Sequence, residues 1–140
     1  WKGRHAWWLI PRLQEEDILH DLMIEQEIKT YNLWTTNTTL DKLAARYYSK
    51  KNEFAKIKVN ENSGKDEHIA TFGENLIKFE IPLEISRRLE KIYQKTKKLE
   101  DLDMKEAIDV FKKNSEIEFV LIKNKMLANK IKEEIILNFR

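Results

Sequence analysis

The chain has 140 residues, of which 36% are charged and 41% are hydrophobic, and 26 Lys and Arg against 24 Asp and Glu leave a net charge of +2. It contains no cysteine, which excludes a disulfide framework and thiolate catalysis. It also has no apolar run near the ~18 residues that would span a bilayer. We expect a single domain over residues 1–140, with charged partners recognised only by local patches.

The N-terminal arm, residues 1–12, is expected to be irregular and holds three of the four tryptophans, three cations and no acid. An indole buries a large apolar face and keeps one N–H for a hydrogen bond, so this composition suits a contact surface. Packing of the arm on its own domain is the alternative, and we favour an interface. The predicted interface anchor consists of Trp1, Arg4, Trp7, Trp8 and Arg12.

Long helices are expected, because the chain has only three Gly and two Pro. Apolar spacing predicts a first helix over about 13–33, a second over about 39–54, a third beginning at Pro82 and running to Leu99, and a fourth over about 104–111. A fifth helix is predicted from Ile117 to the C-terminus. Three pairs have the spacing of helix N-terminal caps: Thr38 with Asp41, Asp103 with Glu106, and Ser115 with Glu118.

The middle of the chain predicts a small amount of strand. Ile77, Phe79 and Ile81 alternate with charged residues, as a half-buried strand does. Residues 55–59 and 68–72 could pair with it as a small sheet, and 60–67 forms a loop that is also the candidate domain joint. The predicted fold class is therefore mainly α, with four to five amphipathic helices and a short strand or hairpin near residues 55–81.

No motif for catalysis, metal or nucleotide stands out. His5, His20 and His68 are far apart, and none has the i, i+4 spacing of a zinc-binding helix. Ser63-Gly64-Lys65 resembles the end of a phosphate loop but lacks the earlier glycine. We therefore expect no cofactor, no metal, no small-molecule substrate and no enzymatic activity.

The strongest local charge pattern lies on the third predicted helix. Its basic residues recur every three or four positions and so share one face, opposite an apolar face. Such a stripe suits a phosphate backbone or an acidic partner, while a solvated lysine face is the simpler alternative. The predicted basic face consists of Arg87, Arg88, Lys91, Lys95 and Lys98.

Residues 76–112 resemble the ribbon-helix-helix motif of small DNA-binding repressors. The run Leu-Ile-Lys-Phe-Glu-Ile-Pro-Leu-Glu-Ile-Ser-Arg-Arg-Leu-Glu-Lys-Ile is similar to that family's strand and first helix, and Met-Lys-Glu-Ala-Ile-Asp-Val-Phe to its second helix. The resemblance implies a dimer that pairs two copies of strand 76–81 and turns Lys78 and Glu80 toward DNA bases. The chain departs from the family at Lys97-Lys98-Leu99, which lacks the usual glycine.

Residues 8–22 resemble a mitochondrial large-subunit ribosomal protein family. That family has a Trp/Arg start followed by an Asp-Leu-His-x-Leu helix. The matching positions here are Trp8, Arg12, Asp17, Leu19, His20 and Leu22, with Ile18 inserted.

The leading functional hypothesis is a non-catalytic binding or scaffold subunit of a larger, RNA-containing, ribosome-like assembly. Protein partners are expected, with RNA or DNA as a further partner. One alternative is a dimeric DNA-binding regulator of the ribbon-helix-helix kind, and the other is an enzyme whose site is dispersed in the sequence. The expected location is inside the cell, with the mitochondrion as a candidate compartment after removal of a targeting segment.

Overall fold

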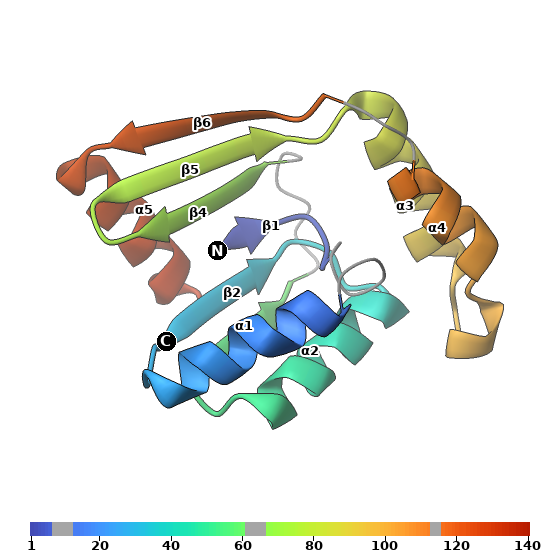
Figure 1. The fold of residues 1–140 in the computed structure, drawn as a ribbon, viewed down its shortest axis with the longest axis horizontal. Helices are drawn as coiled ribbons and strands as arrows, with labels where there is room; N and C mark the ends of the chain where they lie inside the picture. The colour runs from blue at the N-terminus through green and yellow to red at the C-terminus, as the bar shows by residue number, and fades with distance from the viewer. Residues whose placement is uncertain (7–12, 61–66, 113–115) are drawn as a thin grey trace.

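The computed structural model describes residues 1–6, 13–60, 67–112 and 116–140. Within these residues the protein is an α/β structure with one six-stranded mixed sheet and five α-helices (Figure 1). The elements in chain order are β1 (Lys2–Gly3), α1 (Leu13–Glu25), β2 (Thr30–Trp34), α2 (Thr39–Lys51), β3 (Ala55–Val59), β4 (His68–Phe72), β5 (Asn75–Glu80), α3 (Leu83–Lys95), the 3-10 turn η2 (Leu99–Asp101), α4 (Met104–Lys112), β6 (Glu118–Lys123) and α5 (Lys125–Leu137). The predicted mainly α fold is therefore wrong.

The sheet has the strand order β3-β2-β1-β4-β5-β6. Its first half is parallel, with Leu33 of β2 opposite Lys2 of β1 and Lys58 of β3. Its second half is antiparallel, with Ile69 of β4 opposite Lys78 of β5, which in turn lies opposite Val120 of β6. Strand β1 joins the two halves, because it runs parallel to β2 and antiparallel to β4.

Helix α2 connects the adjacent parallel strands β2 and β3. Its start is the predicted Thr38–Asp41 capping box, which the structure confirms. From this start, Ala44 and Tyr48 of its apolar face pack with Trp34 of β2. The opposite face of the sheet carries α5: Lys58 donates to the backbone carbonyl of Asn138, and Tyr31 makes an edge contact with Phe139, with ring centroids 5.4 Å apart.

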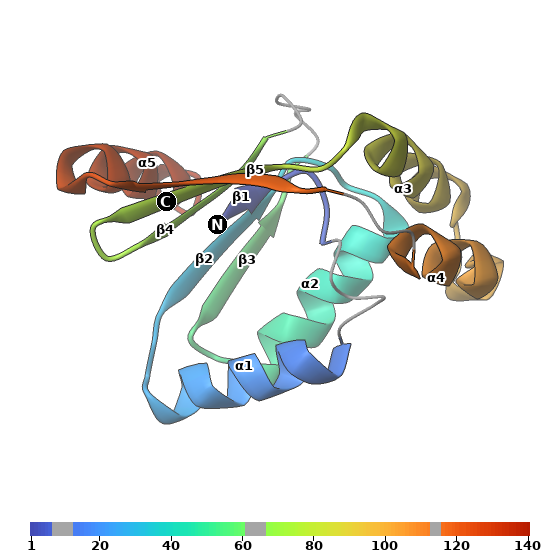
Figure 2. The same cartoon turned by 45° about the horizontal axis from the view of Figure 1, so that its top comes forward.

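Helices α3 and α4 form a hairpin between β5 and β6, at the end of the molecule away from α5 (Figures 1 and 2). Leu89 and Tyr93 of α3 pack with Val110 of α4 and Leu40 of α2 in one buried cluster. This packing brings the end of α3 against the beginning of α2, and the gap between them holds the site described below.

Two segments predicted as helix are strands. The first helix ends at Glu25, and Thr30–Trp34 is the internal strand β2. The last helix begins at Lys125 with Asn124 as its cap, whereas Glu118, the second member of the predicted Ser115–Glu118 cap, is the first residue of β6. Ser115 itself lies outside the described residues. Short apolar runs fit a strand as well as a buried helix, which is why periodicity did not separate them.

The end of α1 carries none of the usual sequence signals. Glu27 adopts a left-handed φ of 50°, a conformation in which glycine normally ends a helix. The N–H of Ile28 then bonds back to the carbonyl of Met23, which closes the helix end. Because neither Gly nor Pro stands near this position, the sequence gives no reason to end the helix there.

The three predicted strand segments are confirmed as β3, β4 and β5, but their pairing differs from the prediction. Strand 68–72 does pair with β5. Strand 55–59 instead pairs with β2 at the far edge of the sheet. Across the described residues, no helix is both long and apolar enough to cross a membrane.

Candidate functional site

A cleft of about 360 Å³ opens between the beginning of α2 and the end of α3. It lies just beyond the carboxyl ends of the parallel strands β1 and β2, where open α/β sheets usually bind their ligands. The lining residues are Arg4, Thr35, Thr36, Asn37, Thr38, Thr39, Lys42, Tyr93, Gln94, Thr96 and Lys97.

The lining is positively charged. Arg4, Lys42 and Lys97 contribute three cations, and no carboxylate is among the described lining residues. Five threonine hydroxyls stand beside these cations. The first turn of α2 adds the positive end of a helix dipole, which the buried Asp41 carboxylate of the same turn partly offsets. Together these groups favour an anionic ligand.

One hydroxyl of the lining is buried and has no hydrogen-bond partner within the described part of the chain. Thr35 is 6% exposed, and its Oγ1 has no hydrogen-bond partner among the described residues. Its backbone N–H donates to the carbonyl of Gly3, which fixes it at the end of β2. A buried hydroxyl without a hydrogen bond costs about 1–3 kcal/mol, so a ligand that accepts from Thr35 would recover this loss.

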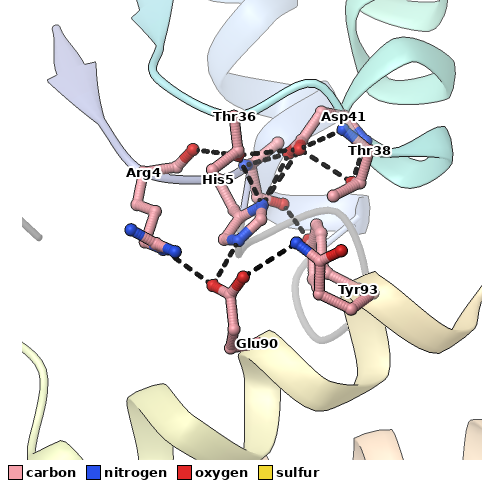
Figure 3. Close-up of polar contacts among 9 residues, drawn as sticks. Arg4, His5, Thr36, Thr38, Asp41, Glu90 and Tyr93 are labelled. Carbon is pink, nitrogen blue, oxygen red and sulfur yellow. Dashed lines mark hydrogen bonds and ion pairs between the residues drawn. The ribbon is translucent and has the colours of Figure 1, made fainter. Parts of the chain in front are cut away.

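Behind the cleft, His5 lies between two carboxylates (Figure 3). Its Nδ1 is 2.9 Å from Asp41 Oδ2, and its Nε2 is 3.0 Å from Glu90 Oε2. Thr36 Oγ1 also lies 2.8 Å from Nδ1. The ring therefore joins α2 to α3 through both of its nitrogens.

Asp41 is fully buried and accepts several hydrogen bonds besides that of His5. The backbone N–H of Ala6 is 3.3 Å from its Oδ1, while the hydroxyls of Thr36 and Thr38 are 2.9 and 2.7 Å from its Oδ2. His5 and Asp41 are both fully buried, so neither side chain presents an atom to the cleft. The pair resembles a catalytic dyad in its residues, but its geometry is that of a structural clamp.

Glu90 connects this clamp to the cleft. Its Oε2 accepts from Arg4 Nε at 2.7 Å, and its Oε1 accepts from Gln94 Nε2 at 2.9 Å. Burial alone would raise the pKa of Glu90, but the hydrogen bonds from Arg4, His5 and Gln94 outweigh burial and lower it to about 2. Glu90 is therefore ionised at neutral pH and orients the Arg4 guanidinium at the cleft wall.

The predicted interface anchor is only partly described. Trp1 is half-buried, with its ring centroid 5.2 Å from that of Phe79 and 6.2 Å from that of His68. Arg4 pairs with Glu90 and lines the cleft. Trp7, Trp8 and Arg12 lie outside the described residues. The described part of the arm thus contacts its own domain, and only Arg4 reaches the candidate site.

The predicted basic face lies on α3 and directly after it. Arg87, Lys91, Lys95 and Lys98 are exposed, and Arg88 is partly buried. The opposite side of the helix is buried through Ile85, Leu89 and Ile92, as the spacing predicted. Because Gln94 and Lys97 line the cleft, the same helix end belongs to both the basic face and the cleft.

Sequence reasoning missed most of the cleft. It treated residues 35–39 as a polar break and His5 as an isolated histidine. The sequence did carry a signal: an apolar segment is followed by a run of threonines and then by a capped helix. This is the order of a strand–loop–helix arrangement, which can bind an anion. Because residues 30–34 were predicted as helix and not as strand, this signal was missed.

The strand required by the ribbon-helix-helix resemblance has no free edge. Strand β5 pairs with β4 on one side and with β6 on the other, both from the same chain. A symmetry-related copy cannot pair with it without displacing one of them.

Comparison with protein-family models, curated proteins and solved structures found no match for this chain. The described residues contain no cluster of three or more His, Cys, Asp or Glu placed to hold a metal ion.

Proposed function

We propose that the chain is a non-catalytic binding domain that holds the phosphate groups of a nucleic acid in its cleft and along α3, as a subunit of a larger RNA-containing assembly. The observation that carries this proposal is the cleft lining, which has three cations and no carboxylate among its described residues. Phosphate contacts by Lys and Arg supply most of the sequence-independent affinity for nucleic acids.

A hydrogen bond joins the two walls of the cleft. Thr39 Oγ1 on α2 donates to the backbone carbonyl of Lys97 at 3.1 Å. Exposed cations stand on both walls, Lys42 on α2 and Lys97 after α3. A phosphate between them would accept from both ammonium groups and from Thr35, with Arg4 already oriented by Glu90.

The basic face of α3 extends this surface beyond a single phosphate. Lys91 and Lys98 are exposed, and neither forms an ion pair with a described acid. These two cations are therefore available to the phosphate backbone of a nucleic acid that continues out of the cleft. A polyanion therefore fits the surface better than a small isolated anion does.

Binding, rather than catalysis, fits the groups next to the cleft. Its strongest candidates for proton transfer, His5 and Asp41, are buried and hydrogen-bonded to each other. General acid–base catalysis requires a group within reach of the substrate that can change its protonation. The clamp instead holds the site in shape.

The test is a fluorescence-anisotropy titration of labelled single-stranded RNA and DNA with wild type and with Lys42→Ala/Lys97→Ala. We expect the double variant to bind roughly tenfold or more weakly, because two phosphate contacts are lost. Lys130→Ala/Lys132→Ala is the matched control, since both lysines are exposed on α5. Equal affinity of the cleft variant and this control would contradict the proposal.

A further inference from the structure

One edge of the sheet is formed by an apolar strand, β6, which pairs with β5 on its inner side and with no described strand on its outer side. β6 reads Glu-Phe-Val-Leu-Ile-Lys, and all six of its residues are exposed. Phe119 is 70% exposed and Leu121 is 60% exposed. Figure 1 shows β6 as the outermost strand, with none of the described elements beyond it.

Such an edge is unusual for a protein that stays monomeric. Edge strands of monomers are commonly protected by a charge in the strand, a proline, a bulge or a covering helix. The interior of β6 has neither a charge nor a proline, and its pairing with β5 is continuous from Glu118 to Lys123 without a bulge. It therefore presents a regular row of backbone N–H and C=O groups between apolar side chains.

We infer that β6 pairs antiparallel with β6 of a second copy of the chain. Its two charges, Glu118 at the start and Lys123 at the end, determine the direction. Parallel pairing would place Glu118 beside its own copy and Lys123 beside its own copy, and like charges directly opposite are destabilising. Antiparallel pairing brings the acidic end of each strand to the basic end of the other.

The register follows from symmetry and side-chain type. A two-fold axis perpendicular to the sheet keeps each residue on its own face, so one residue of the strand must lie opposite its own copy. With Leu121 at the centre, Val120 lies opposite Ile122, Phe119 opposite Lys123, and Glu118 opposite Asn124, whose amide can donate to the carboxylate. The aliphatic part of the Lys123 side chain can lie against the Phe119 ring. With Val120 at the centre, Glu118 would instead lie opposite Ile122, so only the first register gives this carboxylate a polar partner.

The assembly would join two six-stranded sheets into one continuous sheet. Because the two-fold axis is perpendicular to the sheet, each face of one sheet continues into the same face of the other. The two α5 helices therefore lie on one face of the joined sheet, on either side of the new strand pair. Phe119 and Leu121 lie on the other face, where the two Leu121 side chains meet. This inference concerns the edge of the sheet, away from the cleft, and does not depend on nucleic-acid binding.

The first test is sedimentation equilibrium of the purified chain at several concentrations. We expect a monomer–dimer equilibrium in wild type and dimerisation roughly tenfold weaker in Leu121→Lys, which places two ammonium groups opposite each other. Phe72→Lys is the matched control, since Phe72 is 73% exposed on β4, away from β6. A wild type that remains monomeric, or a Leu121→Lys variant that dimerises like the control, would overturn the inference.

The second test fixes the register by cross-linking. The chain has no cysteine, so any protein–protein disulfide formed by one introduced cysteine must join two chains. We expect Leu121→Cys to form a disulfide-linked dimer with oxidised glutathione, because directly opposite Cα atoms are about 4.5–5.5 Å apart. Phe119→Cys should not, because its copy would be about 13 Å away along the strand. Equal cross-linking of the two variants would overturn the proposed pairing.

Discussion

The imidazole of His5 and the carboxylate of Asp41 meet at 2.9 Å although 36 positions separate them in the chain. The contact fixes the segment after β1 against the first turn of α2, and both side chains are fully buried there. Through its other nitrogen, His5 reaches Glu90 of α3. The three elements that surround the cleft are therefore joined by one histidine.

The first prediction concerns this clamp. Asp41→Asn should lower the free energy of unfolding by about 3 kcal/mol or more, because it removes a fully buried carboxylate that is hydrogen-bonded to the segment after β1 and to Thr36. It also turns an amide donor toward Thr36 and Thr38. Urea denaturation followed by circular dichroism measures the change. Asp109→Asn, at an exposed position of α4, should stay within about 0.5 kcal/mol of wild type. A similar stability of the two variants would contradict the clamp.

The second prediction concerns acid stability. The pKa of Glu90 lies near 2 in the folded chain, below its ordinary value of 4.5. The unfolded state thus binds a proton first, so the contribution of Glu90 is complete above about pH 4.5 and is lost as pH falls toward 2. Glu90→Gln should flatten the fall of the melting temperature across this interval, whereas exposed Glu100→Gln should not. If the melting temperature of Glu90→Gln falls with acidification as steeply as that of wild type, the result would argue against the Arg4–Glu90–His5 network.

The third prediction concerns His20, which holds α1 against α2. Burial, and next the nearby Lys51 ammonium, lower the pKa of His20 below its ordinary value of 6.5. The side-chain amide of Asn52 lies 3.2 Å from His20 Nδ1, and the ring stacks on Tyr48 with centroids 4.5 Å apart. Its contribution to stability is therefore complete above pH 6.5 and is lost as pH falls through the lower folded pKa. An NMR titration of the His20 ring protons should give a midpoint below 6.5. A midpoint at or above that value would refute the neutral, buried ring.

The fourth prediction separates stability from binding at Thr35. Thr35→Val removes a buried hydroxyl that has no partner among the described residues, so the free energy of unfolding should rise by about 1 kcal/mol. The same change removes a donor from the cleft, so the affinity for phosphate-bearing ligands should fall. Thr71→Val in β4, which is only partly buried and away from the cleft, is the control for a threonine-to-valine change. A variant that is less stable, or that binds as wild type does, would remove Thr35 from the site.

Local features of this chain could be predicted from the sequence, and long-range ones could not. The Thr38–Asp41 cap was predictable because both partners lie within one helical turn. The basic face of α3 was predictable for the same reason. The contact between His5 and Asp41 depends on β1 lying beside β2, and no local pattern encodes that pairing.

The wrong fold class arose from two particular segments. Thr30–Trp34 and Glu118–Lys123 are short, largely apolar runs next to genuine helices, so they extended the helical patterns of α1 and α5. Aromatic and β-branched residues in both runs favour strands. The choice between helix and strand in these runs depends on packing against neighbouring strands, which only the folded sheet provides. Because both runs were predicted as helix, the predicted sheet lacked the inner strand β2 and the edge strand β6.

The salt dependence of nucleic-acid binding tests the central claim most directly. A plot of the logarithm of the association constant for single-stranded RNA against the logarithm of salt concentration should have a clearly negative slope. Lys97→Ala should reduce the magnitude of that slope by about 0.7, the value expected for one lost phosphate contact. A flat plot, or an unchanged slope in Lys97→Ala, would show that the cleft and α3 do not hold phosphates.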